Sequence, residues 1–138
     1  MERMTLMSDN QSWRTAFLPT TPRLIEQYES NEIRLFDDSF IKNFFSKITL
    51  FLMQFKIIRD IEIMMSDMVS KGSSGVILCR TKYIDDLLQI STDNGIGQVV
   101  ILGAGLDTRP YRIAGISNIK VFEVDLPMQK RIKNIGIS

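Results

Sequence analysis

The feature that most constrains the fold is an apolar run that ends in a glycine turn. Four consecutive apolar residues, Val99–Leu102, lead directly into Gly103-Ala104-Gly105, and Asp107 and Thr108 follow. An apolar strand that runs into such a turn is typical of the first parallel strand of an α/β sheet, where a nucleotide-type cofactor binds at the carboxyl end of the strand. The sequence therefore predicts a cofactor-binding α/β fold.

A second strand is predicted at Lys120–Pro127, and an acidic residue stands near its end. Asp125 lies 20 residues after Gly105, about where such folds place a carboxylate that binds ribose hydroxyls. A short helix from about Thr108 to Ala114, stopped by Gly115, would join the strands. The prediction is a β-α-β cofactor unit over residues 97–138, with the first turns of another helix at its end.

The residues before this unit are predicted to form a helical cap over residues 20–92, preceded by an irregular segment over residues 1–19. Thr21 and Pro22 indicate a helix that begins there and runs to about Ser30. Apolar residues at helical spacing predict one long amphipathic helix, or two in series, over residues 40–69. A break at residues 71–75 precedes a further helix, whose predicted inner face carries Ile77, Thr81, Ile84, Leu87 and Leu88.

Composition excludes several kinds of function. The chain has no histidine, which removes a histidine general base, serine-histidine-aspartate chemistry and histidine metal sites, so no metal is expected. The net charge is +1 with scattered basic residues, and no nucleic-acid partner is expected. The most apolar stretch, residues 48–58, is shorter than the roughly 20 residues that span a bilayer, so no membrane association is expected. A single cysteine, Cys79, fits a reducing compartment, and the cytoplasm is the expected location.

The turn is a poor match for a dinucleotide. The dinucleotide fingerprint requires a third glycine, where this chain has Thr108, and the Asp107 carboxylate would repel a pyrophosphate. It would tolerate S-adenosylmethionine, which has an ammonium, a sulfonium and no phosphate. The alternative is that Asp107 only caps the helix. A dinucleotide-dependent oxidoreductase is a further hypothesis for the function, and Asp107 and Thr108 disfavour it.

Four ordered motifs resemble the leucine carboxyl methyltransferase family and its bacterial relatives, which are class I S-adenosylmethionine-dependent methyltransferases. The resemblance covers residues 14–133. Its motifs are Thr15-Ala16 with Arg23 and Glu26, Leu35–Asp38, Arg80–Asp86, and the glycine turn with the second strand. Ser39 and Phe40 depart from the family pattern, which has proline after the aspartate. The resemblance implies a Rossmann-like sheet, of which this chain would be the N-terminal part only.

The resemblance also implies roles for particular residues. The glycine turn would line the methionine end of the cofactor, Asp125 would bind the ribose, and Arg80 would pair with the cofactor carboxylate. Taken without the family, Arg80 would be a solvated arginine at a helix start. The full predicted cofactor site is Arg23, Arg80, Gly103, Ala104, Gly105, Asp107, Asp125 and Leu126.

The predicted activity is transfer of a methyl group to a carboxylate or hydroxyl oxygen of a small molecule or a peptide carboxylate. A carboxylate acceptor needs no general base, whereas a hydroxyl would need one for which the sequence offers no candidate; no catalytic residue is predicted. Because only two strands are visible, the alternative is a truncated, inactive remnant that acts at most as a binding module. Oligomeric state is not predicted.

Five further interpretations are structural. The first strand is expected to be buried on both faces, and the methionines between residues 63 and 68 are expected to pack in the core. Cys79 is expected to be a buried thiol. Arg109 and Arg112 are expected to form a solvated or structural face of their short helix, and Glu123 is expected to face out of the pocket.

Overall fold

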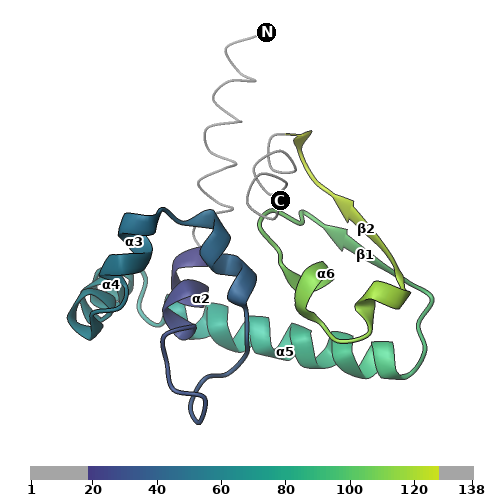
Figure 1. Ribbon diagram of the computed structural model, residues 1–138, viewed down its shortest axis with the longest axis horizontal. Coiled ribbons are helices and arrows are strands. Elements are labelled where there is room, and N and C mark those ends of the chain that lie inside the picture. Colours follow the sequence, from purple (N-terminus) through teal and green to yellow (C-terminus); the bar gives the residue numbers. More distant parts are fainter. Residues whose placement is uncertain (1–18, 128–138) are drawn as a thin grey trace, which may run out of the picture.

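The computed structural model describes residues 19–127, which form a helical region followed by a small sheet (Figure 1). The predicted irregular N-terminal segment, apart from Pro19, and the helix predicted after Pro127 lie outside the described residues. In chain order the elements are α2 (Thr20–Glu26), the 3-10 helix η1 (Ser39–Phe44), α3 (Lys47–Leu52), α4 (Lys56–Val69), α5 (Ser73–Asp93), β1 (Gln98–Leu102), α6 (Arg109–Arg112), the 3-10 helix η2 (Ile116–Asn118) and β2 (Lys120–Val124).

The sheet confirms the predicted α/β class. Strands β1 and β2 are parallel, with Gln98 opposite Lys120 and Leu102 opposite Val124, and α6 lies between them in sequence. The expectation that β1 is buried on both faces is wrong for the described residues, because Val100 is 53% and Leu102 is 76% exposed. Residues of β1 alternate between exposed and half-buried, so only one face of this pair of strands is covered.

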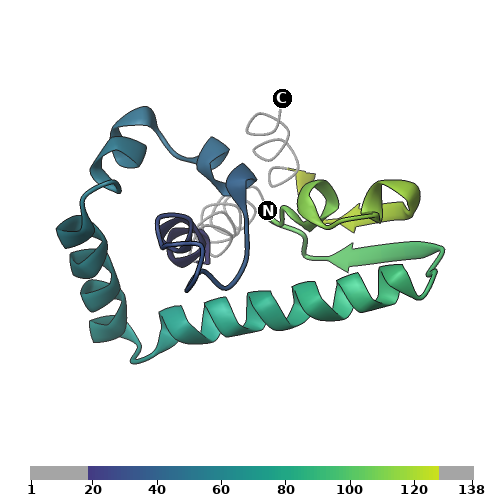
Figure 2. The same cartoon turned by 60° about the horizontal axis from the view of Figure 1, so that its bottom comes forward.

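Helix α5 connects the two parts of the molecule. Figures 1 and 2 show it running along the molecule, with α2, α3 and α4 toward its first half and the sheet toward its second half. The predicted break before it is confirmed, because Gly72 adopts a left-handed φ of 73° at its N-cap. Thr81 and Asp85 are buried on the inner face, but Leu87 is 52% exposed, since it lies about 100° around the helix from Leu88. Placing Leu87 inside was wrong.

The helical core is centred on α2. Leu24, Ile25, Ile41 and Met53 are buried together, with Tyr28, Phe44, Phe45 and Leu50 packed against them. Helix α2 begins at Thr20, two residues before Pro22, the predicted first helical residue, and it ends at Glu26, not near Ser30. Its N-cap is Pro19, without a side-chain cap bond. Pro22 therefore occupies the third helical position, where its missing N–H would have had no partner within the helix anyway.

The segment predicted as one or two helices over residues 40–69 is divided into three, η1, α3 and α4. Ser46 starts α3 by accepting a hydrogen bond from the Thr49 backbone at 3.1 Å. The chain turns again at Met53 and Gln54, where Arg59 donates to both carbonyls at 2.7 and 3.1 Å. These polar contacts mark the breaks between the helices, and hydrophobic periodicity alone does not reveal them.

Two expectations about burial are wrong. Met64 and Met65 are each 58% exposed and Met68 is 80% exposed, because only the opposite side of α4 packs on the rest of the molecule. Cys79 is exposed on α5 rather than buried. Among the described helices, none is long and apolar enough to cross a membrane.

Candidate functional site

The glycine turn leaves the carboxyl end of β1 in a backbone conformation that needs glycine. Gly103 has φ 64° and Gly105 has φ 49°, in the left-handed region that side chains with a Cβ disfavour. The Gly103 N–H donates to the Val124 carbonyl at 2.8 Å, and the Asp107 N–H donates to the Ala104 carbonyl at 2.8 Å. The first bond ties the turn to the end of β2, and the second closes it into a tight loop.

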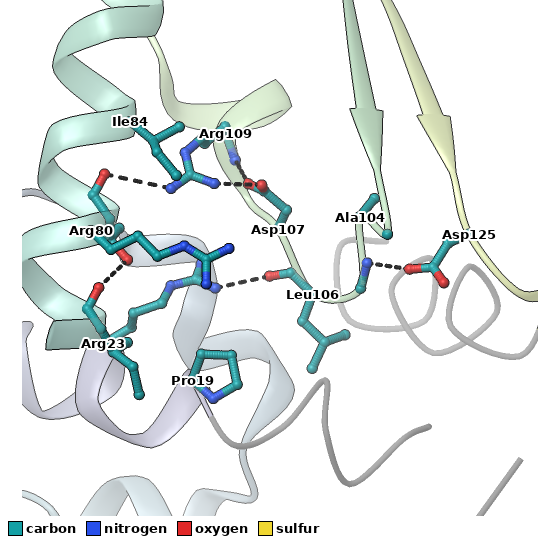
Figure 3. A pocket seen from close by; sticks show the side chains of 13 residues that line it. Pro19, Arg23, Arg80, Ile84, Ala104, Leu106, Asp107, Arg109 and Asp125 are labelled. Carbon is teal, nitrogen blue, oxygen red and sulfur yellow. Dashed lines mark hydrogen bonds and ion pairs between the residues drawn. The ribbon is translucent and has the colours of Figure 1, made fainter. Parts of the chain in front are cut away.

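Asp125 stands beside this turn, immediately after β2. One of its carboxylate oxygens accepts a hydrogen bond from the Gly105 backbone N–H, and the other accepts one from the Leu126 backbone at 2.6 Å (Figure 3). Each carboxylate oxygen has a further lone pair for a ligand hydroxyl. The spacing of 20 residues between Gly105 and Asp125 thus corresponds to a direct contact.

A cavity of about 410 Å³ lies between the glycine turn, α5 and the start of α2. Its size falls within the roughly 300–1,000 Å³ typical of small-molecule sites. Every residue of the predicted cofactor site lines it except Leu126, which is 48% exposed outside the lining. Glu123 is not among the lining residues. Sequence reasoning missed six lining residues: Pro19, Ile77, Thr81, Ile84, Leu106 and Arg109.

Part of this omission was avoidable. Ile77 and Ile84 lie three residues before and four residues after Arg80, so all three share one face of α5. Once Arg80 was placed in the site, helical spacing would have added both isoleucines. Leu106 lies between Gly105 and Asp107, two predicted residues of the turn, whereas Pro19 could not be found from local spacing, because it is the N-cap residue of the distant helix α2.

Arg80 and Arg23 both line the cavity, but they differ in whether the described residues provide an ion-pair partner. The Arg80 side chain extends from α5 toward the glycine turn (Figure 3), and it makes no ion pair with any described residue. The Arg23 side chain is only 9% exposed and forms an ion pair with Asp38. Arg80 is therefore the lining arginine whose charge is not already balanced within the described part of the chain.

Asp107 both lines the cavity and caps the start of α6. One oxygen accepts from the Arg109 backbone N–H at 2.9 Å, and the other accepts from Arg109 Nη1 at 2.6 Å. Burial alone would lower the pKa of Arg109, but the neighbouring carboxylates of Asp107 and Asp85 outweigh it and raise this pKa above its ordinary value. Asp107 thus faces the cavity with its charge balanced by a permanently charged arginine.

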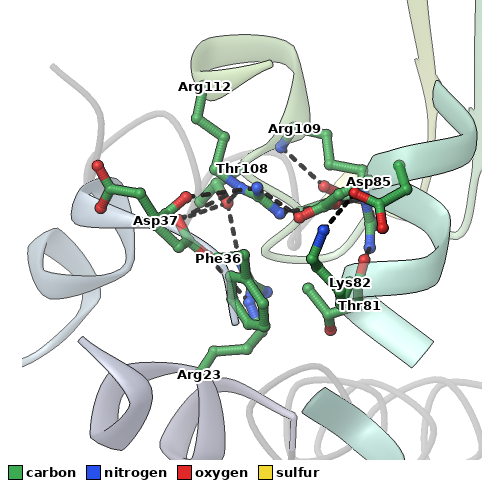
Figure 4. Close-up of polar contacts among 12 residues, drawn as sticks. Arg23, Phe36, Asp37, Thr81, Lys82, Asp85, Thr108, Arg109 and Arg112 are labelled. Atoms are coloured by element: carbon green, nitrogen blue, oxygen red, sulfur yellow. Dashed lines mark hydrogen bonds and ion pairs between the residues drawn. The ribbon is translucent and has the colours of Figure 1, made fainter. Parts of the chain in front are cut away.

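A network of buried charges supports the turn from behind (Figure 4). Asp85 accepts from Arg109 Nε at 2.7 Å and from Arg112 Nη1 and Nη2 at 2.6 and 2.9 Å. The prediction that Arg109 and Arg112 have a structural role is therefore confirmed. The alternative prediction, that they form a solvated face, is wrong, since their side chains are only 14% and 7% exposed. Thr108, at the third-glycine position, is fully buried and hydrogen bonded within this network.

The fold is that of an α/β protein, with a cavity of small-molecule size at the carboxyl end of a parallel strand. A family model for leucine carboxyl methyltransferase matches residues 16–137. The chain belongs to the leucine carboxyl methyltransferase family.

Relatives whose names describe S-adenosyl-L-methionine-dependent methyltransferases match shorter stretches of the chain. A Streptomyces coelicolor protein carrying the name of an S-adenosyl-L-methionine-dependent methyltransferase is 47% identical over 57 residues, which is 41% of this chain and 20% of that protein. A Mycobacterium bovis protein with the same kind of name is 51% identical over 51 residues, 37% of this chain and 17% of that protein. The match thus spans about a fifth of each relative. No solved structure matches the chain.

Proposed function

We propose that this cavity is the methionine and ribose part of an S-adenosylmethionine site, in a methyltransferase whose sheet is Rossmann-like. The observation that carries the proposal is the placement of Arg80 and Asp125 on one cavity with the glycine turn. An arginine without an ion-pair partner among the described residues suits the carboxylate of the cofactor. An aspartate with lone pairs left suits the two ribose hydroxyls.

The residues present fit this cofactor better than a dinucleotide. Two carboxylates, Asp107 and Asp125, line the cavity, and Asp125, which forms no ion pair with any described residue, would oppose a pyrophosphate. They are compatible with an ammonium and a sulfonium. A Cβ built on Gly103 would meet nothing within 4 Å, so the space beside this glycine is open to a ligand that approaches the backbone.

The residues of this chain would bind and orient the cofactor rather than transfer protons. When bound, S-adenosylmethionine supplies a methyl group on a sulfonium, which an oxygen nucleophile can displace directly. A carboxylate acceptor is ionised at neutral pH and needs no base, which agrees with a chain that has no histidine. We therefore propose a small-molecule or peptide carboxylate as the acceptor, with a hydroxyl oxygen as the second possibility.

A second candidate is a binding module without transferase activity. It is favoured by the exposed apolar face of the sheet, where Val100, Leu102, Phe122 and Val124 are each more than half exposed. A parallel sheet in a functioning α/β enzyme is covered on both faces. Under this candidate the chain binds the cofactor but turns over no acceptor.

Calorimetric titration of the purified chain with S-adenosylhomocysteine tests the proposal, after circular dichroism has established that the chain is folded. We expect saturable binding, and no binding of NAD⁺. Arg80→Gln should weaken binding about 10-fold or more, since a charged hydrogen bond contributes about 1.5–3 kcal/mol. Lys82→Gln is the matched control. It removes the positive charge of the exposed Lys82–Asp86 ion pair and should bind S-adenosylhomocysteine as the wild type does.

Two outcomes would decide against the proposal or its acceptor. A folded chain that binds NAD⁺ but not S-adenosylhomocysteine would contradict the cofactor assignment. Transfer of labelled methyl from the cofactor to carboxylate acceptors separates the two candidates for function. A carboxylate acceptor gives an ester that releases methanol in base, whereas a hydroxyl acceptor gives a base-stable ether.

A further inference from the structure

The hydrogen bonds of Arg23 point to a role other than direct ligand binding. Its Nε and Nη2 donate to one oxygen of Asp38, with the Nε bond at 3.0 Å. Its Nη2 also donates to Thr108 Oγ1 at 2.8 Å, and its Nη1 donates to the Leu106 carbonyl at 3.2 Å. Four hydrogen bonds therefore engage a group with five N–H donors, although Arg23 lines the cavity.

The partners of Arg23 lie on both sides of Asp107 in the glycine turn. The Leu106 carbonyl precedes Asp107, and the Thr108 hydroxyl follows it. One planar guanidinium thus bridges the two neighbours of a residue that lines the cavity. Because both ends of this short span are fixed by the same side chain, a shift of Arg23 would displace the backbone of the turn.

Asp38 holds this arrangement from a place that no ligand reaches. It is fully buried, it is absent from the cavity lining, and its second oxygen accepts from Thr108 Oγ1 at 2.7 Å. The Asp38 backbone N–H donates to Gln27 Oε1 on α2 at 2.7 Å. Asp38 therefore links α2 to a turn 70 residues further along the chain.

We infer that Arg23 is a positioning residue of the cofactor site, held by Asp38 and Thr108, and that it acts through the backbone of the turn at Leu106–Thr108. This inference rests on the proposed cofactor site. It differs from the sequence-based prediction, which includes Arg23 among the residues that bind the cofactor. Its charge is already matched by Asp38, and its donors are directed to the protein.

Asp38→Asn separates the two roles because they predict opposite changes. The variant keeps the shape of the side chain and removes its charge, so the positive charge of Arg23 is no longer balanced. If Arg23 bound the cofactor carboxylate directly, S-adenosylhomocysteine would bind more tightly. If Arg23 positions the turn, binding should weaken by about 10-fold or more. Asp37→Asn is the matched control, because Asp37 is the exposed neighbour, and it should bind as the wild type does.

Thr108 gives a second pair of variants, in case Asp38→Asn does not fold. Thr108→Val keeps the volume but removes the hydroxyl that donates to Asp38 and accepts from Arg23, and it should weaken binding about fivefold or more. Thr108→Ser keeps the hydroxyl and should restore binding to within about twofold of the wild type. Equal affinities for the valine and serine variants would overturn the inference.

Hydrogen exchange reports on the turn without any ligand. We expect faster exchange in a peptide covering residues 103–109 of Asp38→Asn, with a peptide from α5 unchanged, because the turn loses its support while the helix does not. Unchanged exchange at residues 103–109, or tighter binding of S-adenosylhomocysteine, would overturn the inference. If the wild type binds no S-adenosylhomocysteine, the proposed function fails, while the exchange result still decides whether Asp38 positions the turn.

Discussion

Asp85 is a buried carboxylate near the site whose removal should lower the stability of the fold. Its carboxylate is 8% exposed and accepts three hydrogen bonds, one from Arg109 and two from Arg112. Breaking a buried ion pair from one side typically costs about 3–5 kcal/mol, because the remaining charge is left buried. In the variant, Arg109 would still pair with Asp107, and Arg112 would still donate a hydrogen bond to Thr108. We therefore expect Asp85→Asn to lower the free energy of unfolding by about 3 kcal/mol, at the low end of that range.

Urea denaturation followed by circular dichroism at 222 nm measures this loss. Asp86→Asn is the matched control, because Asp86 is the next residue, its side chain is 54% exposed, and it pairs with Lys82 on the surface of α5. Exposed pairs of this kind contribute about 0.5 kcal/mol or less. The reasoning would be refuted if Asp85→Asn and Asp86→Asn had free energies of unfolding within about 0.5 kcal/mol of each other.

Three further predictions concern the site and the alkaline limit of stability. Asp125→Ala should weaken S-adenosylhomocysteine binding by about 1–3 kcal/mol in calorimetry, because the ribose hydroxyls lose their acceptor. Gly105→Val should abolish binding in the same assay, since a β-branched residue is strained at φ 49° and fills the approach to the backbone. Burial raises the pKa of Tyr28 and of Tyr111 above 10.0. The stability that their protonated forms contribute is present below about pH 10 and is lost as the pH rises through the raised pKa, so thermal melts from about pH 9 to pH 11 should show a falling midpoint.

Each of these predictions has its own control. Asp86→Ala should leave the dissociation constant unchanged, and an equally unchanged constant in Asp125→Ala would remove Asp125 from the site. Gly97→Val places a valine at an exposed glycine with open space around it, so it should bind normally; full binding by Gly105→Val would mean that the turn serves structure alone. For the alkaline loss of stability, a Tyr28→Phe/Tyr111→Phe variant should show a shallower fall in the thermal unfolding midpoint. A fall identical to that of the wild type would contradict its assignment to these two tyrosines.

The β-α-β unit could be predicted because its signals are local. The apolar run of β1, the glycines that adopt positive φ, and the spacing from Gly105 to Asp125 all lie within one β-α-β unit. Each signal reflects a short-range requirement of the backbone. The structure confirms the parallel strands and the turn, whereas the cofactor roles assigned to these residues stay predictions. The break before α5 was found for the same reason, since Gly72 supplies a left-handed residue.

The helical region and the charge network could not be predicted in this way because they depend on distant contacts. The turn between α3 and α4 is fixed by Arg59 reaching back to the Met53 and Gln54 carbonyls. Asp38 and Thr108 meet across 70 residues, and nothing in either local sequence indicates the other. The motif containing Arg80 and Asp85 was recognised, but only the fold shows that Asp85 binds Arg109 and Arg112.

The most direct test of the central claim is to locate the bound ligand on the folded chain. Titration of ¹⁵N-labelled protein with S-adenosylhomocysteine, followed by amide chemical shifts, does this residue by residue. The proposal predicts saturable shifts concentrated at Gly103, Gly105, Asp107 and Asp125, with the amides of α4 unchanged. Shifts that avoid the glycine turn, or spectra that do not change at saturating ligand, would contradict the assignment of this cavity as a cofactor site.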